Sequence, residues 1–530
     1  MKQIGQFLML LLFVTFISSC FSSGSKQNSV KKKPNILFIF SDDHAFQAIS
    51  AYGGRLKDVA PTPNIDRIAD EGMLFNRCLV TNSICGPSRA TIISGKYGHL
   101  NGFVSNEGGT RFDGSQLTFP KVLQQGGYKT GIVGKWHLGS DPTGFDYWEV
   151  LPDQGFYYNP KFITPDGVHE ETGYVTEIIT DKAIDFLNNA SQSDQPFMLM
   201  VQHKAPHREW EPGPNELSLY KDVNFPEPET MFDTYEGRGS AAHEQDMTIA
   251  VTMRMDRDLK MFENEKLGTT TRLNEEQEKA WDAVYDPIIN YYKEANLTGD
   301  DLVRFKYQRY MQDYLACIAG VDKSVGKILN YLKEKGLDEN TIVVYSSDQG
   351  FYLGEHGWFD KRFMYEESLR TPLLVKWPGV TKPGSKNSDI VSNLDFGETF
   401  LDMAGLEVPE EMQGESFVPI LKGNTPNDWR KNFYYHYYEY PSWHMVKRHY
   451  GIATERYKLI HFYYDVDEWE LYDLQEDPME MKNVYNDANY LSVRENLHQQ
   501  LNELRMKYKD SDELTQEYLQ QSLKNLKHYQ

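Results

Sequence analysis

Residues 85–91 have the sequence Cys-Gly-Pro-Ser-Arg-Ala-Thr, which places a thiol directly before a helix-compatible run. Pro87 suits the first turn of a helix, because the N–H that proline lacks has no partner there. The N-terminus of such a helix offers free N–H groups and a positive dipole end to an anion near Cys85. Arg89 adds a planar cation that suits an oxyanion such as sulfate or phosphate. A lone cysteine would indicate an ordinary core residue, but this combination predicts a nucleophile beside an anion site.

A second group of residues offers hard oxygen ligands. Asp42 and Asp43 follow one apolar run, and Asp348 and Gln349 follow another. Three carboxylates and an amide suit Ca²⁺ or Mg²⁺ better than zinc, which prefers histidine and cysteine. An Asp-Asp pair alone would indicate a turn or a helix cap. Its recurrence after a second apolar run predicts a site for a divalent cation.

Four continuous apolar runs, each followed by polar residues, must position these groups. The runs cover 36–40, 130–133, 197–201 and 341–345. Apolar runs of about five residues are typical of strands that are buried on both faces. Helical patterns at 63–71, 176–188 and 301–335 lie between them, so we expect an α/β fold with a mainly parallel sheet covered by helices. Ligands of such sheets bind beyond the carboxyl ends of the strands, where the polar residues would lie.

The sequence pattern changes near residues 424–429, and short aromatic runs follow. These runs cover 433–440, 450–454, 458–464 and 468–472. They predict an antiparallel sheet, followed by a helix over 488–509 and a polar, peripheral tail. We therefore expect a catalytic domain over 34–428 and a small C-terminal subdomain over 429–530.

The first residues are predicted to be a targeting segment. Lys2 precedes a mostly apolar run over 7–17 that is too short to span a bilayer. The run ends in Ile-Ser-Ser-Cys at Cys20, which resembles the lipobox of a bacterial lipoprotein. We expect residues 1–20 to be a lipoprotein signal peptide and Cys20 to anchor the protein to a membrane, in the periplasm or at the cell surface. An ordinary secretory signal is the alternative. The polar segment 21–33 would be a flexible tether.

The net charge of −22 argues against a nucleic-acid partner. An anionic substrate would then need a local basic pocket. Segment 204–238, rich in proline, glutamate and aromatic residues, is expected to be a long loop over the mouth of the site. Cys78 and Cys317 could form a disulfide in a secreted protein, but both lie in apolar surroundings, which favours free thiols in the core.

The stretch 85–91, with Ser94-Gly95 beyond it, resembles the signature of the type I sulfatases. In that family the cysteine is oxidised to Cα-formylglycine, so the resemblance implies that Cys85 is modified by a formylglycine-generating enzyme. It extends over roughly residues 34–483, which is nearly the whole mature chain. It implies an alkaline-phosphatase-like sulfatase fold, with a large mixed sheet sandwiched by helices. A small C-terminal antiparallel-sheet subdomain with a helix would complete the fold.

The resemblance also implies roles for individual residues. One divalent cation, Ca²⁺ or Mg²⁺, would be held by Asp42, Asp43, Asp348 and Gln349, where the family has Asn or His in place of Gln349. The sequence Gly-Lys-Trp-His-Leu-Gly at 134–139 matches a second sulfatase segment. It implies that Lys135 contacts the sulfate and that His137 orients the formylglycine hydrate. Lys361 matches a later sulfate-contacting lysine. His203 or His207 would protonate the leaving sugar oxygen, and we favour His207.

The mechanism implied by the resemblance uses a geminal diol at residue 85. The cation and Arg89 lower the free energy needed to ionise one hydroxyl, and that oxygen attacks the sulfur. Lys135, Lys361 and the cation hold the sulfate charge, while a histidine protonates the leaving alcohol. The second hydroxyl is then deprotonated, so that sulfate is expelled and the aldehyde re-forms.

Two further segments resemble the N-acetylglucosamine-6-sulfatases. They are Asp-Lys-Arg at 360–362, with Tyr-Glu at 365–366, and Tyr-Glu-Gly-Arg at 235–238. The resemblance implies hydrolysis of 6-O-sulfate on N-acetylglucosamine in heparan sulfate, keratan sulfate or mucin glycans. Asp360 and Arg362 would hydrogen-bond the sugar, and His444 and His449 would close one wall of the pocket. The alternatives are a sulfatase for another sulfated sugar, a phosphoesterase of the same superfamily, and a glycan-binding lipoprotein with an inactive fold.

Overall fold

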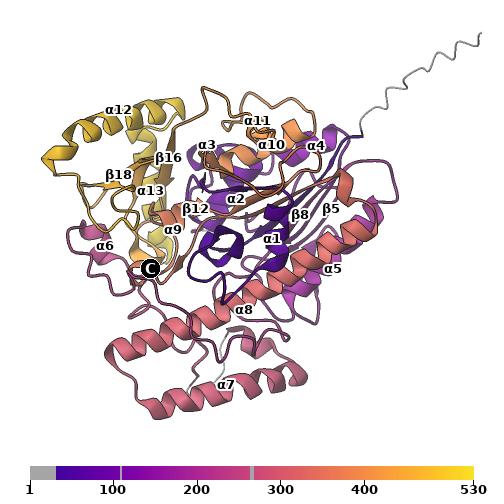
Figure 1. The fold of residues 1–530 in the computed structure, drawn as a ribbon, viewed down its shortest axis with the longest axis horizontal. Helices are drawn as coiled ribbons and strands as arrows, with labels where there is room; N and C mark the ends of the chain where they lie inside the picture. Colours follow the sequence, from indigo (N-terminus) through magenta and orange to yellow (C-terminus); the bar gives the residue numbers. More distant parts are fainter. Residues whose placement is uncertain (1–31, 108–109, 263–267, 530) are drawn as a thin grey trace, which may run out of the picture. The chain divides into compact units, whose positions relative to one another are not determined.

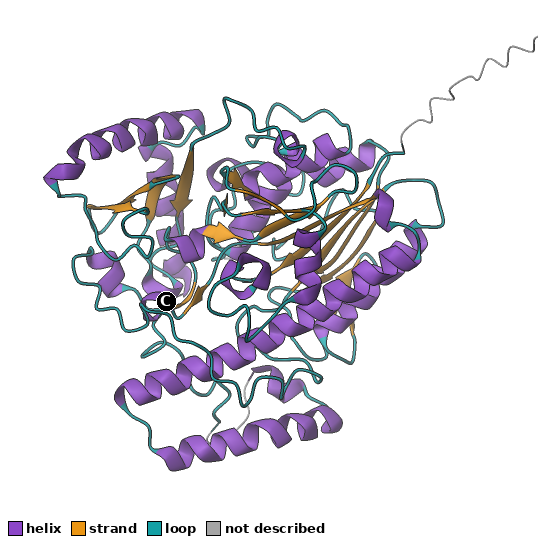
Figure 2. Ribbon diagram, viewed as in Figure 1, coloured by secondary structure: helices purple, strands orange, loops and turns teal. Residues whose placement is uncertain are grey.

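A mixed sheet of ten strands forms the centre of this computed structural model, which describes residues 32–107, 110–262 and 268–529. Figures 1 and 2 show the sheet between layers of helices. Its strands are β1 (Asn35–Ser41), β2 (Met73–Phe75), β4 (Lys129–Lys135), β5 (Tyr147–Leu151), β6 (Lys161–Thr164), β7 (Gly167–Glu170), β8 (Phe197–His203), β9 (Thr341–Ser347), β13 (Leu373–Lys376) and β14 (Ser385–Asn387). Their order across the sheet is β14-β2-β13-β9-β1-β8-β4-β5-β6-β7.

The four predicted apolar runs become neighbouring strands at the centre of this sheet. Strand β1 pairs in parallel with β8 and β9, and β8 pairs in parallel with β4. The predicted parallel arrangement is therefore confirmed for these strands. Antiparallel pairing of β13 with β9, and of β6 with β5, makes the whole sheet mixed.

The alternating side chains of β1 divide the hydrophobic core into two layers. Leu37 and Ile39 pack into one layer with α1 (Pro63–Asp70), α5 (Val175–Ala190) and α8 (Gly299–Glu334). Ile36, Phe38 and Phe40 pack into the other, because successive strand residues point to opposite faces. The helices of this second layer are α2 (Cys85–Ser94), α4 (Phe119–Gln125) and α10 (Phe396–Met403). The predicted helices over 63–71, 176–188 and 301–335 are confirmed as α1, α5 and α8.

Shorter elements complete the fold, and one of them, α11 (Val418–Leu421), packs in the second layer. The other helices among them are α3 (Gly98–Asn101), α6 (Ser240–Glu244) and α9 (Glu366–Leu369). The strands are β3 (Cys78–Leu79), β12 (Arg370–Thr371) and β15 (Val391–Ser392), which form a small sheet, and the pair β10 (Tyr352–Leu353) and β11 (Phe359–Asp360). The predicted loop over 204–238 contains no helix or strand. Helix α7 (Glu275–Ala295), which the sequence analysis did not predict, packs on α8 through Tyr292 and Phe305, whose ring centroids lie 5.4 Å apart.

The C-terminal part contains the predicted antiparallel sheet. Its strands, in order, are β16 (Asn432–Tyr437), β17 (His449–Thr454), β18 (Tyr457–Phe462) and β19 (Glu468–Asp473). The predicted helix is α12 (Leu491–Lys507), which packs on one face of that sheet. The tail forms a further helix, α13 (Asp512–Tyr529), in which Leu519 is only 3% exposed. The chain from Lys33 onward is one compact unit, and the division at 428/429 stays a prediction.

The predicted signal peptide, the lipidated Cys20 and most of the predicted tether lie outside the described residues. No helix in the described part of the chain combines the length and the apolar character needed to cross a bilayer. Cys78 and Cys317 are buried free thiols, as expected.

Candidate active site

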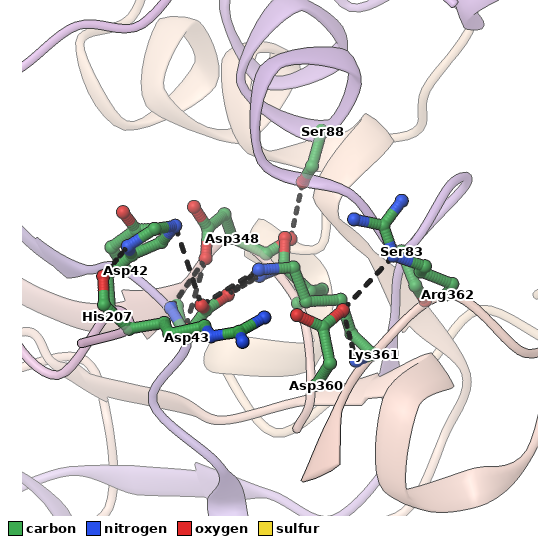
Figure 3. Close-up of polar contacts among 12 residues, drawn as sticks. Asp42, Asp43, Ser83, Ser88, His207, Asp348, Asp360, Lys361 and Arg362 are labelled. Atoms are coloured by element: carbon green, nitrogen blue, oxygen red, sulfur yellow. Dashed lines mark hydrogen bonds and ion pairs between the residues drawn. The ribbon is translucent and has the colours of Figure 1, made fainter. Parts of the chain in front are cut away.

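The carboxyl ends of the central strands bring the predicted metal ligands together. Asp42 and Asp43 follow β1 and Asp348 follows β9, and all three side chains are fully buried. One carboxylate oxygen from each of the three lies within 4.8 Å of the other two (Figure 3). The Asp43 backbone N–H donates to Asp348 Oδ1 over 3.0 Å, and Gln349 Nε2 donates to Asp43 Oδ1 over 2.5 Å.

Two oxygen atoms of this cluster have no hydrogen-bond donor among the described residues. Asp42 Oδ1 and Gln349 Oε1 are buried and accept no hydrogen bond from the described residues. Buried oxygens without a donor beside other carboxylates fit the ligand shell of a hard divalent cation. Burial, followed by the nearby Asp42 charge, raises the pKa of Asp348 to about 8. Three ionised carboxylates at this spacing therefore need added positive charge.

Three basic side chains each pair with one of these carboxylates. Arg89 donates from Nε (3.1 Å) and Nη2 (2.9 Å) to Asp348 Oδ2. Lys361 Nζ donates to both oxygens of Asp43, over 2.7 and 2.8 Å, and Lys135 Nζ contacts Asp42 Oδ2. Since the formal charges of these pairs cancel, a bound divalent cation would make the cluster positive and suited to an anion.

Cys85 is the first residue of α2 and is 1% exposed. The ligand-type atoms of Cys85, Asp42 and His207 lie within 4.8 Å of one another. Burial, and then the charge of Asp42, raises the pKa of the Cys85 thiol well above its ordinary value. Because a reactive cysteine needs a lowered pKa, this thiol is not itself a thiolate nucleophile.

The predicted histidines separate into two groups. His207 Nε2 lies 3.9 Å from Asp43 Oδ2, so the structure brings it to the cluster. His203 is the last residue of β8, and its Nε2 lies 3.0 Å from Ser324 Oγ on α8. The preceding residue, Gln202, faces Arg89 on the opposite side of the sheet, as strand alternation requires. The structure therefore does not bring His203 into the site, which leaves His207 as the histidine placed for proton transfer.

Lys135 is the last residue of β4 and His137 lies just beyond it, and the two are linked by a residue that the sequence did not indicate. Gln154 Oε1 lies 2.5 Å from Lys135 Nζ, and Gln154 Nε2 lies 3.0 Å from His137 Nε2. No motif surrounds Gln154, and only the path of the chain after β5 places it there. Burial, and then the Lys135 charge, lowers the pKa of His137 well below its ordinary value, so its ring is neutral.

The predicted sugar-binding residues Asp360, Arg362 and His444 form a second cluster beside Lys361. Arg362 Nε donates to Asp360 Oδ1 over 3.1 Å, and His444 Nε2 lies 3.4 Å from Asp360 Oδ2. All three residues have positive φ, at 81°, 94° and 66°, a strained backbone conformation that clusters at functional sites. Burial alone would raise the pKa of Asp360, but Lys361, His444 and Arg362 hold it well below its ordinary value. Asp360 therefore stays ionised and can accept hydrogen bonds.

Arg208 joins this sugar cluster although the sequence analysis did not single it out. It donates to both oxygens of the buried Asp258, over 2.7 and 2.8 Å, and its Nη1 lies 3.4 Å from His444 Nε2. Its place directly after His207 was the one available signal. His449 lies apart from the cluster, because its ring packs against Tyr435 and Phe462 at 5.5 and 5.0 Å. The structure thus places His449 in an aromatic core and not at the pocket wall.

Comparison with protein families gives two matches. Residues 34–406 match the family described as "Sulfatase", and residues 354–507 match "N-sulphoglucosamine sulphohydrolase, C-terminal". An N-acetylglucosamine-6-O-sulfatase of Bacteroides thetaiotaomicron is 51% identical over 528 residues, which are 97% of this chain and 93% of the relative. An N-acetylglucosamine-6-sulfatase of Capra hircus is 28% identical over 77% of this chain and 67% of its own length.

A solved structure gives a similar result. A chain described as bound to its substrate D-glucosamine-2-N,6-O-disulfate superposes with a TM-score of 0.88 at 50% identity. The match covers 91% of this chain and 99% of the solved one. The expected fold, with a large mixed sheet, covering helices and a small C-terminal antiparallel sheet, is therefore confirmed.

Proposed function

This chain belongs to the sulfatase family, and from that membership we propose that it hydrolyses the 6-O-sulfate of N-acetylglucosamine in sulfated glycans. The observation that carries the proposal is the cluster of Asp360, Arg362 and His444 directly beside Lys361, which contacts Asp43. This arrangement puts hydrogen-bonding groups for a sugar next to the charged groups for a sulfate. Relatives with N-acetylglucosamine-6-sulfatase names and a similar chain bound to a 6-O-sulfated glucosamine support the same substrate.

The cation is proposed to be Ca²⁺. Asp42, Asp43, Asp348 and Gln349 would hold it, because they offer only oxygen ligands and two of those oxygens lack hydrogen-bond donors among the described residues. Oxygen-rich sites without a fixed geometry suit Ca²⁺, whereas Mg²⁺ requires a near-octahedral shell. When bound, the cation supplies charge stabilisation for the sulfate oxygens. Gln349 Oε1 is available for this role without any change in the contact that its Nε2 makes with Asp43.

Cys85 is proposed to act after oxidation to formylglycine, whose hydrate supplies one oxygen to attack sulfur and a second hydroxyl that allows sulfate to leave. Arg89, held by Asp348, lies one turn after Cys85 on α2 and favours an ionised oxygen at residue 85. Lys135 and Lys361 are the cations that would turn toward the sulfate oxygens, since each has ammonium protons to donate. Their present partners, Asp42 and Asp43, would then bind the cation.

His207 is proposed to protonate the departing O6 of the sugar. Burial, and then the Lys135 charge, lowers the pKa of His207 well below its ordinary value, so the ring is neutral before substrate binds. A sulfate ester beside it brings a negative charge, which favours the protonated form. The substrate therefore helps to generate the acid that releases its own alcohol.

Sulfate release tests this proposal directly. The chain would be co-expressed with a formylglycine-generating enzyme, and the mass of the peptide containing Cys85 would be measured in the same sample. We expect sulfate release from 6-O-sulfo-N-acetylglucosamine and none from its 4-O-sulfo isomer or from glucosamine 6-phosphate. A sample that carries the aldehyde but leaves the 6-O-sulfo sugar intact would overturn the substrate assignment. Release of phosphate would favour the phosphoesterase alternative.

We further propose that the protein is exported as a lipoprotein anchored through Cys20. The support is the Ile-Ser-Ser-Cys sequence that ends the apolar segment. A Cys20→Ala variant should leave the membrane fraction, and the wild-type protein should carry acyl chains that mass spectrometry detects. An unmodified Cys20 in membrane-associated protein would contradict the proposal.

A further inference from the structure

Gln154 makes two contacts whose donors and acceptors can be assigned from chemistry alone. Its Oε1 lies 2.5 Å from Lys135 Nζ, and its Nε2 lies 3.0 Å from His137 Nε2. A lysine ammonium has protons to donate and no lone pair, so the amide must present its oxygen to Lys135. The amide NH₂ group therefore faces His137 Nε2.

This assignment fixes the state of the His137 ring. An NH₂ group can only donate, so His137 Nε2 must accept, and the ring proton must reside on Nδ1. His137 Nδ1 is buried and has no hydrogen-bond partner within the described residues. The ring therefore holds an unused N–H donor on the side opposite Gln154. The lowered pKa of His137 is consistent with a neutral ring.

We propose that Gln154 is a positioning residue that fixes the Nδ1–H tautomer of His137 and so keeps a ring N–H available to donate to the hydrate proposed at residue 85. This inference rests on the proposed sulfatase function. The neighbouring Asp153 gives the contrast, because its Oδ1 lies 3.6 Å from His137 Nε2 and its side chain is 86% exposed. A carboxylate that bonded to Nε2 would draw the proton there and turn Nδ1 into an acceptor. Gln154 prevents this by occupying Nε2 as a donor.

Three variants separate the possible roles of this side chain. Gln154→Glu keeps the size but offers only acceptors, so it should move the His137 proton to Nε2. Gln154→Leu removes both hydrogen bonds, and Gln154→Asn keeps their chemistry on a shorter stem. Asp153→Asn serves as the matched control, because it changes a charge next to the same ring without touching the amide.

The first measurement is ¹⁵N NMR of the protein labelled at histidine, in which the His137 signal is identified by its loss in His137→Asn. We expect the Nδ1–H tautomer in the wild type and in Asp153→Asn, and an Nε2 proton in Gln154→Glu. This measurement needs neither substrate nor the oxidised residue 85. A wild-type His137 that carries its proton on Nε2 would overturn the inference, even if the enzyme removes 6-O-sulfate as proposed.

The second measurement is steady-state sulfate release, from the 6-O-sulfo sugar and from an aryl sulfate. We expect Gln154→Glu and Gln154→Leu to lower kcat about 10- to 100-fold with KM within about threefold, and Gln154→Asn to recover part of the loss. Asp153→Asn should keep kcat. An unchanged kcat in Gln154→Glu with a switched tautomer would show that the tautomer does not matter to the reaction. Activity on the aryl sulfate alone would count against the proposed sugar and leave this comparison intact.

Discussion

Burial, and then the Asp42 charge, raises the pKa of the Cys85 thiol well above its ordinary value, so the folded protein favours the protonated thiol. The same surroundings suit a neutral hydrate that loses a proton only when Arg89 and a cation stabilise the charge. Burial thus disfavours attack by a thiolate and is compatible with attack by the hydrate of an oxidised residue 85. The motif at residues 85–91 indicated a nucleophile, but only the buried position indicates that the unmodified thiol is a poor one.

Replacing Cys85 tests whether residue 85 supplies the nucleophile. Cys85→Ala should lower sulfate release by about 10³-fold or more, as removal of a nucleophile does, while its melting temperature stays near that of the wild type. Cys317→Ala makes the same change at another buried thiol, on α8, and should keep full kcat. Near-normal activity in Cys85→Ala would exclude residue 85 as the nucleophile.

Gln349 is the proposed metal ligand at which this chain differs from the family pattern that the sequence resemblance implies. Its Oε1 is buried without a hydrogen-bond donor from the described residues, so Gln349→Leu should raise the Ca²⁺ concentration for half-maximal activity about tenfold or more. Gln349→Asn retains a carbonyl and should have a smaller effect. Titration of chelator-treated enzyme with Ca²⁺ measures both, and equal Ca²⁺ requirements in wild type and Gln349→Leu would remove Gln349 from the ligand set.

Individual elements were predictable where their cause is local. The four central strands are continuous apolar runs, and α1, α5 and α8 have clear helical spacing. Strands of two residues, such as β3 and β12, form only because segments far apart in the chain pair, and no local pattern indicates them. Helix α13 escaped prediction because its sequence is mostly polar and because it contacts His99, Tyr438 and Arg448, which are far away in the chain.

Those contacts give α13 a testable role. Tyr518 OH donates to the His99 carbonyl over 3.1 Å, and Arg448 Nη2 donates to Ser522 Oγ over 2.9 Å. The buried Arg448 also donates from Nε to the Tyr440 carbonyl, at the start of the segment that leads to His444. Deletion of residues 511–530 should lower the melting temperature by about 3–6 °C and raise KM more than it lowers kcat. Deletion of 524–530 keeps both contacts and should change neither value.

Helix α10 carries a carboxyl group that makes stability depend on pH. Burial, and then the Asp395 charge, raises the pKa of Glu398 from 4.5 to about 8. The folded protein thus favours the protonated form, so its stabilisation is complete below pH 4.5 and is lost as the pH rises toward 8. Glu398→Gln, which imitates the protonated form, should raise the melting temperature at pH 8 by about 2–4 °C and have little effect at pH 4.5. Glu411→Gln, at an exposed ion pair with Lys96, should change it by less than about 1 °C at either pH.

The whole molecule carries 77 acidic and 55 basic residues, for a net charge of −22. A sulfated glycan therefore meets a repulsive field until it reaches the basic groups at the strand ends. Salt screens this long-range repulsion, so kcat/KM should rise by about twofold between about 10 mM and 150 mM NaCl at saturating Ca²⁺. A fall over this range would indicate that a local positive field steers the substrate.

Across the whole molecule, the fold could be predicted from the sequence, whereas the residues at the rim of the site could not. The charged cluster was predictable from the motif at residues 85–91 and from the aspartates at the strand ends. Those residues lie on rigid elements or directly after them, so their positions depend on short segments of the chain. Gln154 and Arg208 lie on long connections whose paths depend on the whole chain. His203 and His449 carry the right chemistry in the right segments, but strand alternation turns His203 toward α8 and packing encloses His449.

The burial of α2 bears on whether oxidation of residue 85 comes before or after folding. Cys85 is 1% exposed, and every residue of the helix that begins with it is buried, so a folded chain presents no segment that an oxidising enzyme could grasp. The oxidation proposed here must then come before folding, in the short interval when the chain is still extended. If residue 85 must be oxidised as proposed, a chain that folds before oxidation would be inactive, and later exposure to the oxidising enzyme would restore activity only after unfolding.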